Sequence, residues 1–250
     1  MNILVTNDDG IDHLGIKILV SELSKKHNIF VAAPNTQCSG LSGAVTFYNY
    51  IRVEKYPLDV GEKSSYKIHG TPADCVIIGL DELVKNVDLV ISGLNDEPNV
   101  GDDTRLSGTL GACIESVFSS TPAIAFSMDY GQDNIVQETA IFFIKKIVDF
   151  VEKNPLPEGI YLNVNIPNKP ISSIKGIKIT RLGRRRYKNR VNLADDNIKN
   201  VYKIYGQLIK EYETNTDSWA LDNDYVSITP FKIDNTDYDN IDYFKVLSDN

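Results

Sequence analysis

The stretch that decides the fold is Ile3-Leu4-Val5-Thr6-Asn7-Asp8-Asp9-Gly10. A short apolar run that ends in a turn signal is typical of a buried strand. The carboxylates of Asp8 and Asp9 would then lie at the carboxyl end of this strand, where open α/β sheets bind their ligands. Adjacent carboxylate oxygens suit a divalent cation such as Mg²⁺ or Mn²⁺. The same residues would also suit a turn that caps the next helix, so the octapeptide alone leaves both interpretations open.

Strand and helix patterns alternate along the next 140 or so residues. Apolar residues recur at helical spacing within 16–23, 76–84, 110–117 and 136–151. Apolar runs typical of buried strands cover 29–33, 88–92 and 123–127. This alternation indicates βαβ units. The sequence therefore predicts an α/β fold with a doubly wound, mainly parallel, Rossmann-like sheet.

The residue pattern of the sequence changes beyond Pro157. Residues 161–167 and 177–180 alternate like strands, and residues 184–240 are polar, rich in tyrosine and poor in helical signals. We predict a core over residues 1–155 and a smaller C-terminal section of strands and extended ribbons over residues 156–250, without a disordered linker between them.

Composition narrows the class of protein without naming a function. A net charge of −8 argues against a general nucleic-acid binder. No apolar run approaches the ~18 residues that a membrane span needs, and no signal peptide is visible. The three cysteines, Cys38, Cys75 and Cys113, fit neither a disulfide framework nor a zinc motif. We therefore expect a cytoplasmic protein that interacts with neither a nucleic-acid duplex nor a membrane.

Three loops that follow predicted strands or precede predicted helices carry polar groups. Residues 34–43 are rich in glycine and serine. Their backbone N–H groups could bind an anion, or the segment could be an ordinary surface loop. Residues 92–103 are loaded with side-chain oxygens, which suits either a functional loop or a solvated acidic one. Ser107, Gly108 and Thr109 precede a helix, where they would bind phosphate or simply cap the helix.

The loops after neighbouring parallel strands meet at one edge of a sheet, so the acidic metal ligands, the glycine-serine loop and the helix N-terminus would face one crevice. Together they suit metal-assisted phosphoryl chemistry. No Gly-x-x-x-x-Gly-Lys motif and no Gly-x-Gly-x-x-Gly motif is present, which argues against ATP-driven and dinucleotide chemistry. The three histidines, His13, His27 and His69, lack metal-binding spacing, and we expect structural roles for them.

The chain resembles the survival protein SurE family of metal-dependent 5′/3′-nucleotidases, which are acid phosphatases of broad specificity. The motifs that carry the resemblance are Thr-Asn-Asp-Asp-Gly at 6–10, Ala-Pro at 33–34 with Ser-Gly at 39–40, Gly-Thr-Pro-Ala-Asp-Cys-Val at 70–76, Ser-Gly-Leu-Asn at 92–95, Ser-Gly-Thr at 107–109, Leu-Asn-Val-Asn-Ile-Pro at 162–167, Thr-Asp at 216–217 and Tyr-Val-Ser-Ile-Thr-Pro at 225–230. Their order and spacing cover nearly the whole chain.

The resemblance implies hydrolysis of nucleoside monophosphates, or other small phosphate esters, by attack of a metal-activated water. It implies one divalent metal ion, Mg²⁺ or Mn²⁺, bound by Asp8, Asp9, Ser39 and Asn95, with Asp8 and Asp9 catalytic. It places Asn99 and Ser107, Gly108 and Thr109 near the substrate phosphate. It also implies a homodimer or homotetramer in which the C-terminal section exchanges between subunits.

The chain departs from the family pattern at several positions. Glu97 replaces a usual glycine, and its carboxylate would clash with the phosphate, add a metal ligand or point to solvent. Leu106 replaces an aromatic residue, Gly43 a polar one, and Thr36 stands where arginine is common. Two alternatives therefore stay open: a weakened homologue that binds nucleotide or phosphate as a sensor, and an oxidoreductase or transferase on the same kind of sheet.

Two features lie outside the predicted crevice. The basic run at 184–190 would steer phosphate-bearing substrates, form a subunit contact or be solvated. Trp219 and its neighbouring tyrosines would stack on a nucleobase or, more commonly for such residues, pack in a core or interface.

Overall fold

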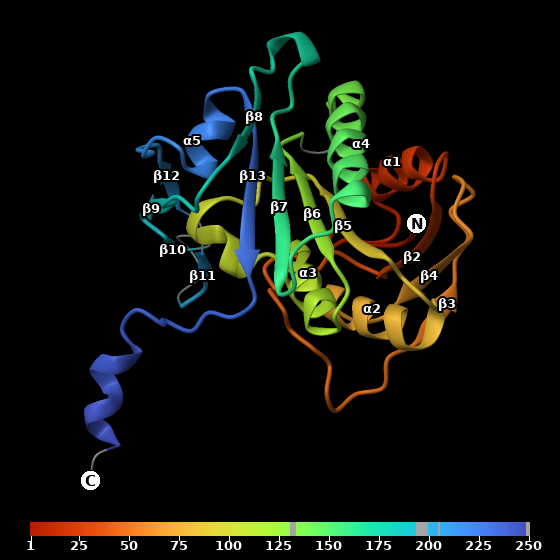
Figure 1. Ribbon diagram of the computed structural model, residues 1–250, viewed down its shortest axis with the longest axis horizontal. Helices are drawn as coiled ribbons and strands as arrows, with labels where there is room; N and C mark the ends of the chain where they lie inside the picture. Colours follow the sequence, from red (N-terminus) through yellow and green to blue (C-terminus); the bar gives the residue numbers. More distant parts are fainter. Residues whose placement is uncertain (131–133, 194–199, 205, 249–250) are drawn as a thin grey trace.

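A nine-stranded sheet runs through the computed structural model, which describes residues 1–250 except 131–133, 194–199, 205 and 249–250 (Figure 1). In spatial order its strands are β3 (Val53–Lys55), β4 (Ser64–Ile68), β2 (Asn28–Pro34), β1 (Asn2–Thr6), β5 (Leu89–Asn95), β6 (Ala123–Met128), β7 (Ile160–Ile166), β13 (Tyr225–Lys232) and β8 (Gly176–Ile179). The strands from β4 to β7 pair in parallel with their neighbours, whereas β3 and β13 pair antiparallel with β4 and β7. The predicted α/β class with a mainly parallel sheet is confirmed.

Helices cover both faces of this sheet (Figure 1). They are α1 (Leu14–Leu23), α2 (Pro72–Ile78), α3 (Gly108–Phe118) and α4 (Gln137–Lys153). Successive residues of a strand point to opposite faces, so Ile3 and Val5 pack in the core beneath α1 and α4, while Leu4 packs beneath α2 and α3. The buried strands are apolar on both faces for this reason.

The motif at 70–76 begins α2. Thr71 caps the helix and Asp74 completes a capping box, and Asp74 also accepts hydrogen bonds from the backbone and hydroxyl of Thr46 at 2.9 and 2.7 Å. The motif therefore fixes the loop that follows β2 to the helix. Beyond Ile78 the predicted helix continues as a π-helical turn, η1 (Gly79–Leu83).

Beyond residue 155, the chain both completes the sheet and adds short ribbons. The ribbons are β9 (Arg186–Lys188) with β12 (Gln207–Ile209) and β10 (Val191–Leu193) with β11 (Tyr202–Ile204), both antiparallel. Residues 184–240 also contain the strand β13 and the helix α5 (Asp217–Asp222), and the helix was not predicted. Six residues of helix show too little periodicity to be recognised, and β13 is identified only by its pairing with β7 and β8.

Three further short helices are η2 (Gly101–Leu106), η3 (Ile171–Ser173) and η4 (Ile241–Leu247). The last lies on an arm that extends away from the sheet (Figure 1). Within the described parts of the chain, no helix has both the length and the apolar character needed to cross a membrane.

Candidate functional site

A crevice of about 1340 Å³ opens where β1 and β5 end. The strand order reverses here, since β1 is followed along the chain by β2 on one side while β5 and β6 extend the sheet on the other. Such a switch point is where doubly wound sheets bind ligands. Of the predicted site residues, the crevice is lined by Asp8, Ser39, Asn95, Glu97, Asn99 and Ser107.

The other three predicted residues lie directly behind this wall. The hydroxyl of Thr109 donates a hydrogen bond of 2.6 Å to Asp8 Oδ1. Gly108 packs so closely that a Cβ there would lie 2.8 Å from the Cβ of Asp8. The side chain of Asp9 is only 2% exposed. The structure thus brings all nine predicted residues together at one edge of the sheet.

Asp8 and Asp9 form an electrostatically unfavourable pair. Burial raises the pKa of Asp8 above its ordinary value, against the opposing hydrogen bond from Thr109. Burial, and then the neighbouring charge of Asp8, raises the pKa of Asp9 to about 7. Among the described residues, Asp9 Oδ2 is buried and has no hydrogen-bond partner. Two buried carboxylates in this state attract a cation.

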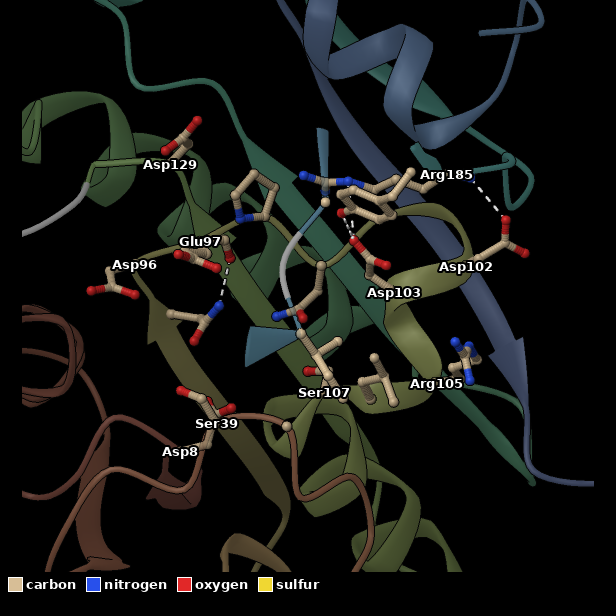
Figure 2. A pocket seen from close by; sticks show the side chains of 18 of the residues that line it. Asp8, Ser39, Asp96, Glu97, Asp102, Asp103, Arg105, Ser107, Asp129 and Arg185 are labelled. Atoms are coloured by element: carbon tan, nitrogen blue, oxygen red, sulfur yellow. Dashed lines mark hydrogen bonds and ion pairs between the residues drawn. The ribbon is translucent and has the colours of Figure 1, made fainter. Parts of the chain in front are cut away.

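The loop that carries Ser39 is fastened to this carboxylate pair from both sides. The N–H of Cys38 donates to the carbonyl of Asp8 at 2.6 Å, and the N–H of Ile11 donates to the carbonyl of Pro34 at 2.9 Å. On the other side, the N–H of Ser42 donates to the carbonyl of Leu106 at 3.1 Å. The backbone of Ser42 also packs on Gly111 of α3, where a Cβ would lie 2.1 Å from its carbonyl oxygen. These contacts hold Ser39 beside Asp8 (Figure 2).

Asn95 at the end of β5 is buried, and its amide orientation is fixed. Its Nδ2 donates to the backbone carbonyl of Glu97, which leaves Oδ1 as the atom that can bind a ligand. The side chain of Glu97 is exposed and lines the crevice. The backbone carbonyl of Glu97 therefore fixes the orientation of Asn95 independently of the Glu97 carboxylate.

Asn99 is held by a buried amide network. Its N–H donates to Asn165 Oδ1 at 2.8 Å, and its carbonyl accepts from the side-chain amides of Asn163 and Asn165 at 2.8 and 3.0 Å. Its own Nδ2 donates to Ser127 Oγ at 2.9 Å. Asn163 and Asn165 of the motif at 162–167 therefore position Asn99.

Ser107 caps α3, because its Oγ accepts a hydrogen bond from the N–H of Leu110 at 3.2 Å. The capping interpretation of this residue is therefore confirmed. Capping does not exclude an anion here, because the first turn of a helix leaves further N–H groups and the positive end of the helix dipole at the same place.

The far wall of the crevice is basic. Figure 2 shows Asp96, Glu97 and Asp129 on one side and Arg105 and Arg185, together with Asp102 and Asp103, on the other. Arg185 pairs with Asp103 at 3.1 Å, and its N–H donates to Asp102 at 2.8 Å. The basic run at 184–190 therefore lies partly against the crevice and is bonded to η2.

One buried carboxylate joins this wall to the C-terminal section. Asp217 accepts hydrogen bonds from the N–H groups of Gly101, Gly183 and Ser218 at 2.8, 2.9 and 2.7 Å. Gly101 has a φ of +58°, and a Cβ there would lie 2.9 Å from the Cβ of Arg185. Asp217 thus fixes the start of η2, whose end leads into Ser107.

His13 lies in the site although its spacing in the sequence predicted a structural role. Its Nδ1 lies 3.6 Å from Asp9 Oδ2 and its Nε2 lies 3.5 Å from Asp96 Oδ2. The Asp96 carboxylate raises the pKa of His13. The only sequence signal was the interval of four residues between Asp9 and His13, which is uninformative outside a helix.

Comparisons with known proteins agree on one family. The family model described as "Survival protein SurE" matches residues 3–189. Two relatives named "5'-nucleotidase SurE" are similar over almost their whole length. The one from Clostridium botulinum (strain Alaska E43 / Type E3) is 38% identical, with 99% of each chain covered. The one from Aquifex aeolicus (strain VF5) is 39% identical, with 98% of each covered. The crystal structure of the Sure protein from Aquifex aeolicus superimposes with a TM-score of 0.87 at 38% identity, covering 100% of both chains.

Proposed function

This chain belongs to the survival protein SurE family, and we propose that it is a phosphomonoester hydrolase that releases phosphate from nucleoside monophosphates in the crevice between β1 and β5. The names of its relatives support the reaction. The observation that carries the proposal is that the buried carboxylates of Asp8 and Asp9 meet the N-terminus of α3 in a single crevice. A cation site beside an anion site is what phosphoryl transfer requires.

We propose that one divalent ion, Mg²⁺ or Mn²⁺, is held by Asp8, Asp9, Ser39 and Asn95. The donors fit such an ion, because they are all oxygens, two are carboxylates, and Asp9 Oδ2 is buried without a partner among the described residues. When bound, the ion would polarise the phosphoryl group and lower the pKa of the attacking water.

Other groups of the protein would bind the phosphate and orient the metal ligands. The N–H groups at the start of α3 and the side chain of Asn99 would bind the phosphate oxygens. The hydroxyl of Thr109 donates to Asp8 Oδ1 and orients the carboxylate, so that Oδ2 would face the ion and the water that it activates. Asn163 and Asn165 position Asn99 and so fix the phosphate without contacting it.

The Glu97 side chain is proposed as a modulator of this reaction. It stands exposed on the same side of the crevice as Asp96 and Asp129 (Figure 2), where its charge would repel a phosphate and raise KM. The comparisons give no support to the alternative of a nucleotide sensor.

The test is phosphate release from a panel of nucleoside monophosphates and generic phosphate esters, with and without Mg²⁺ or Mn²⁺. We expect metal-stimulated release in the wild type, none in Asp8→Asn, and wild-type rates in the control Asp81→Asn, an exposed carboxylate on η1. Absence of release from every ester would refute the proposal. Release restored by Glu97→Gly in that case would favour a damaged enzyme.

We further propose a homodimer or homotetramer formed through the C-terminal section, residues 156–250. Large apolar side chains are exposed there on the ribbons and on η4, namely Val191, Leu193, Tyr202, Ile204, Tyr243, Phe244, Val246 and Leu247. Light scattering of the purified protein would test this. A cytoplasmic location is proposed on the three free, buried cysteines.

A further inference from the structure

We infer that arginines on the far wall of the crevice bind a second phosphate of the substrate, so that the enzyme prefers nucleoside 3′,5′-bisphosphates to nucleoside monophosphates. The arginines that line the crevice there include Arg105, Arg186 and Arg190. The inference rests on the proposed function, because the first phosphate is the one that is hydrolysed beside Asp8 and Asp9.

The size of the crevice leaves room for a second phosphate. Its volume of about 1340 Å³ exceeds the roughly 300–1000 Å³ that is typical of small-molecule sites. Asp8, Ser39 and Ser107 line one part of it, where the metal and the first phosphate are proposed to bind, and the arginines line another part. A nucleoside monophosphate bound beside Asp8 would therefore leave the arginines without an anion.

The acidic residues of the arginine wall already have basic or polar partners. Asp103 pairs with Arg185 at 3.1 Å and also accepts a hydrogen bond from the hydroxyl of Tyr187. Asp102 accepts from the N–H of Arg185 at 2.8 Å. Since successive residues of a strand point to opposite sides, Arg186, which precedes Tyr187 in β9, points away from Asp103.

Three arginines of this wall have no acidic partner among the described residues. Arg105, Arg186 and Arg190 are exposed and line the crevice, and none of them makes an ion pair with a residue that the structure describes. A guanidinium group is always charged, and its planar fork of donors matches the oxygens of a phosphate. This wall therefore offers positive charge that the protein itself does not neutralise.

The chain places one of these arginines next to the site of the first phosphate. Arg105 lies in η2, two residues before Ser107, which is the N-cap of α3. Two residues of chain span at most about 7 Å. A second phosphate carried by the ribose of the same substrate therefore comes within reach of the Arg105 side chain.

The acidic side of the crevice repels a second phosphate. Figure 2 shows Asp96, Glu97 and Asp129 on the side away from Arg105. Their charges disfavour an additional anion, whereas the arginines attract one. The crevice is thus polarised, and this polarity fixes the direction in which a nucleoside bisphosphate binds.

The reaction on such a substrate is hydrolysis of one phosphate ester. Water adds to the phosphorus atom beside Asp8, the P–O bond to the ribose breaks, and a proton from the water goes to the ribose oxygen. The products are inorganic phosphate and a nucleoside monophosphate, whose remaining phosphate is the one held by the arginines.

The experiment compares kcat/KM for adenosine 3′,5′-bisphosphate and adenosine 5′-monophosphate at low ionic strength. We expect the wild type to favour the bisphosphate about tenfold, and Arg105→Gln or Arg186→Gln to lower this ratio about threefold to tenfold. The preference should disappear in the double variant. The matched control is Arg181→Gln, which removes the same charge from an exposed pair with Glu213 at 2.5 Å outside the crevice and should leave the ratio unchanged.

Adenosine 5′-diphosphate and tripolyphosphate distinguish a second phosphate on the ribose from one in an anhydride chain. An arginine-dependent preference for these two compounds that the bisphosphate does not share would overturn the inference. Equal kcat/KM values for the two adenosine nucleotides in the wild type, or a preference that the double variant keeps, would also overturn it. Release of phosphate from the monophosphate would then leave the proposed function standing.

A binding measurement separates the inference from the proposed function. If neither nucleotide is hydrolysed, the proposed function fails, and titration calorimetry tests the second phosphate site by itself. Tighter binding of the bisphosphate than of the monophosphate by the wild type, lost in the double variant, supports the site. Equal binding of the two nucleotides overturns it.

Discussion

The buried carboxylate of Asp217 links the crevice to the C-terminal section through hydrogen bonds. The substitution Asp217→Asn tests this link, because the two side chains have almost the same shape. Asp217 is fully buried, and among the described residues its Oδ2 accepts only from the N–H of Gly101, while Oδ1 accepts from Gly183 and Ser218. An asparagine amide can keep the pair of bonds on Oδ1 only by pointing its NH₂ at the Gly101 N–H. One buried donor is then left unsatisfied, and the other two bonds lose their charge assistance.

The expected cost follows from these three bonds. An unsatisfied buried donor costs about 1–3 kcal/mol, and replacing a charged acceptor by a neutral one costs roughly 1 kcal/mol per bond. Weaker desolvation of the amide offsets part of this, so we expect the free energy of unfolding to fall by about 2–4 kcal/mol. For a chain of this size that corresponds to a Tm lower by about 5–15 °C.

The assay is thermal and urea unfolding at one fixed protein concentration. Asp222→Asn is the control, because this carboxylate lies on the same helix but makes only an exposed pair with Lys210 at 3.4 Å, worth less than about 0.5 kcal/mol. Because Gly101 begins the segment that leads to Ser107, KM for the substrate should also rise in Asp217→Asn. If the two variants have the same Tm, Asp217 does not fasten the crevice and the reasoning is refuted.

Three further predictions concern the crevice itself. In the metal-free protein, burial raises the pKa of Asp9 from its ordinary value of 3.8 to about 7, so the folded state holds the extra proton. The stability of the wild type relative to Asp9→Asn should therefore fall as pH rises from about 4 to 7, and saturating Mn²⁺ should remove this trend in urea titrations. Thr109→Val removes the 2.6 Å hydrogen bond to Asp8 and should lower kcat/KM about tenfold, whereas Thr109→Ser should not. Asn163→Ala removes one of two amide donors to the Asn99 carbonyl and should lower kcat/KM about fivefold with the metal count unchanged.

The fold was predictable because its core strands are buried on both faces. Continuous apolar runs such as 89–91 and 123–126 are what such strands require, and the helical spacing between them left little choice of architecture. The C-terminal part offered no such signal. Tyr225–Lys232 takes its place in the sheet from pairing with β7 and β8, and pairing between distant segments is not written in local sequence.

The site was predictable where a functional residue sits at the end of an element. Asp8 follows the end of β1 by two residues, Asn95 is the last residue of β5 and Ser107 is the N-cap of α3, so the topology of the sheet alone brings them together. Residues that act by positioning other residues could not be identified from the sequence. Asn163 and Asn165 lie inside a strand and show ordinary polar alternation, and Asp217 lies in the first turn of α5, a helix too short to be recognised. Their roles depend on which backbone groups tertiary packing places opposite them.

The position of His13 also changes the meaning of Glu97. In the sequence alone, Glu97 is an additional negative charge near one metal ion, where it would repel the substrate phosphate. In the structure it stands beside Asp96, which faces the imidazole of His13 on the same side of the crevice. The Asp96 carboxylate raises the pKa of His13 and so favours the imidazolium, whose positive charge offsets part of the negative charge of this wall. The departure from the family pattern at 97 therefore adds one charge to a wall that already holds Asp96 and Asp129, and Glu97→Gly should lower KM for a nucleoside monophosphate.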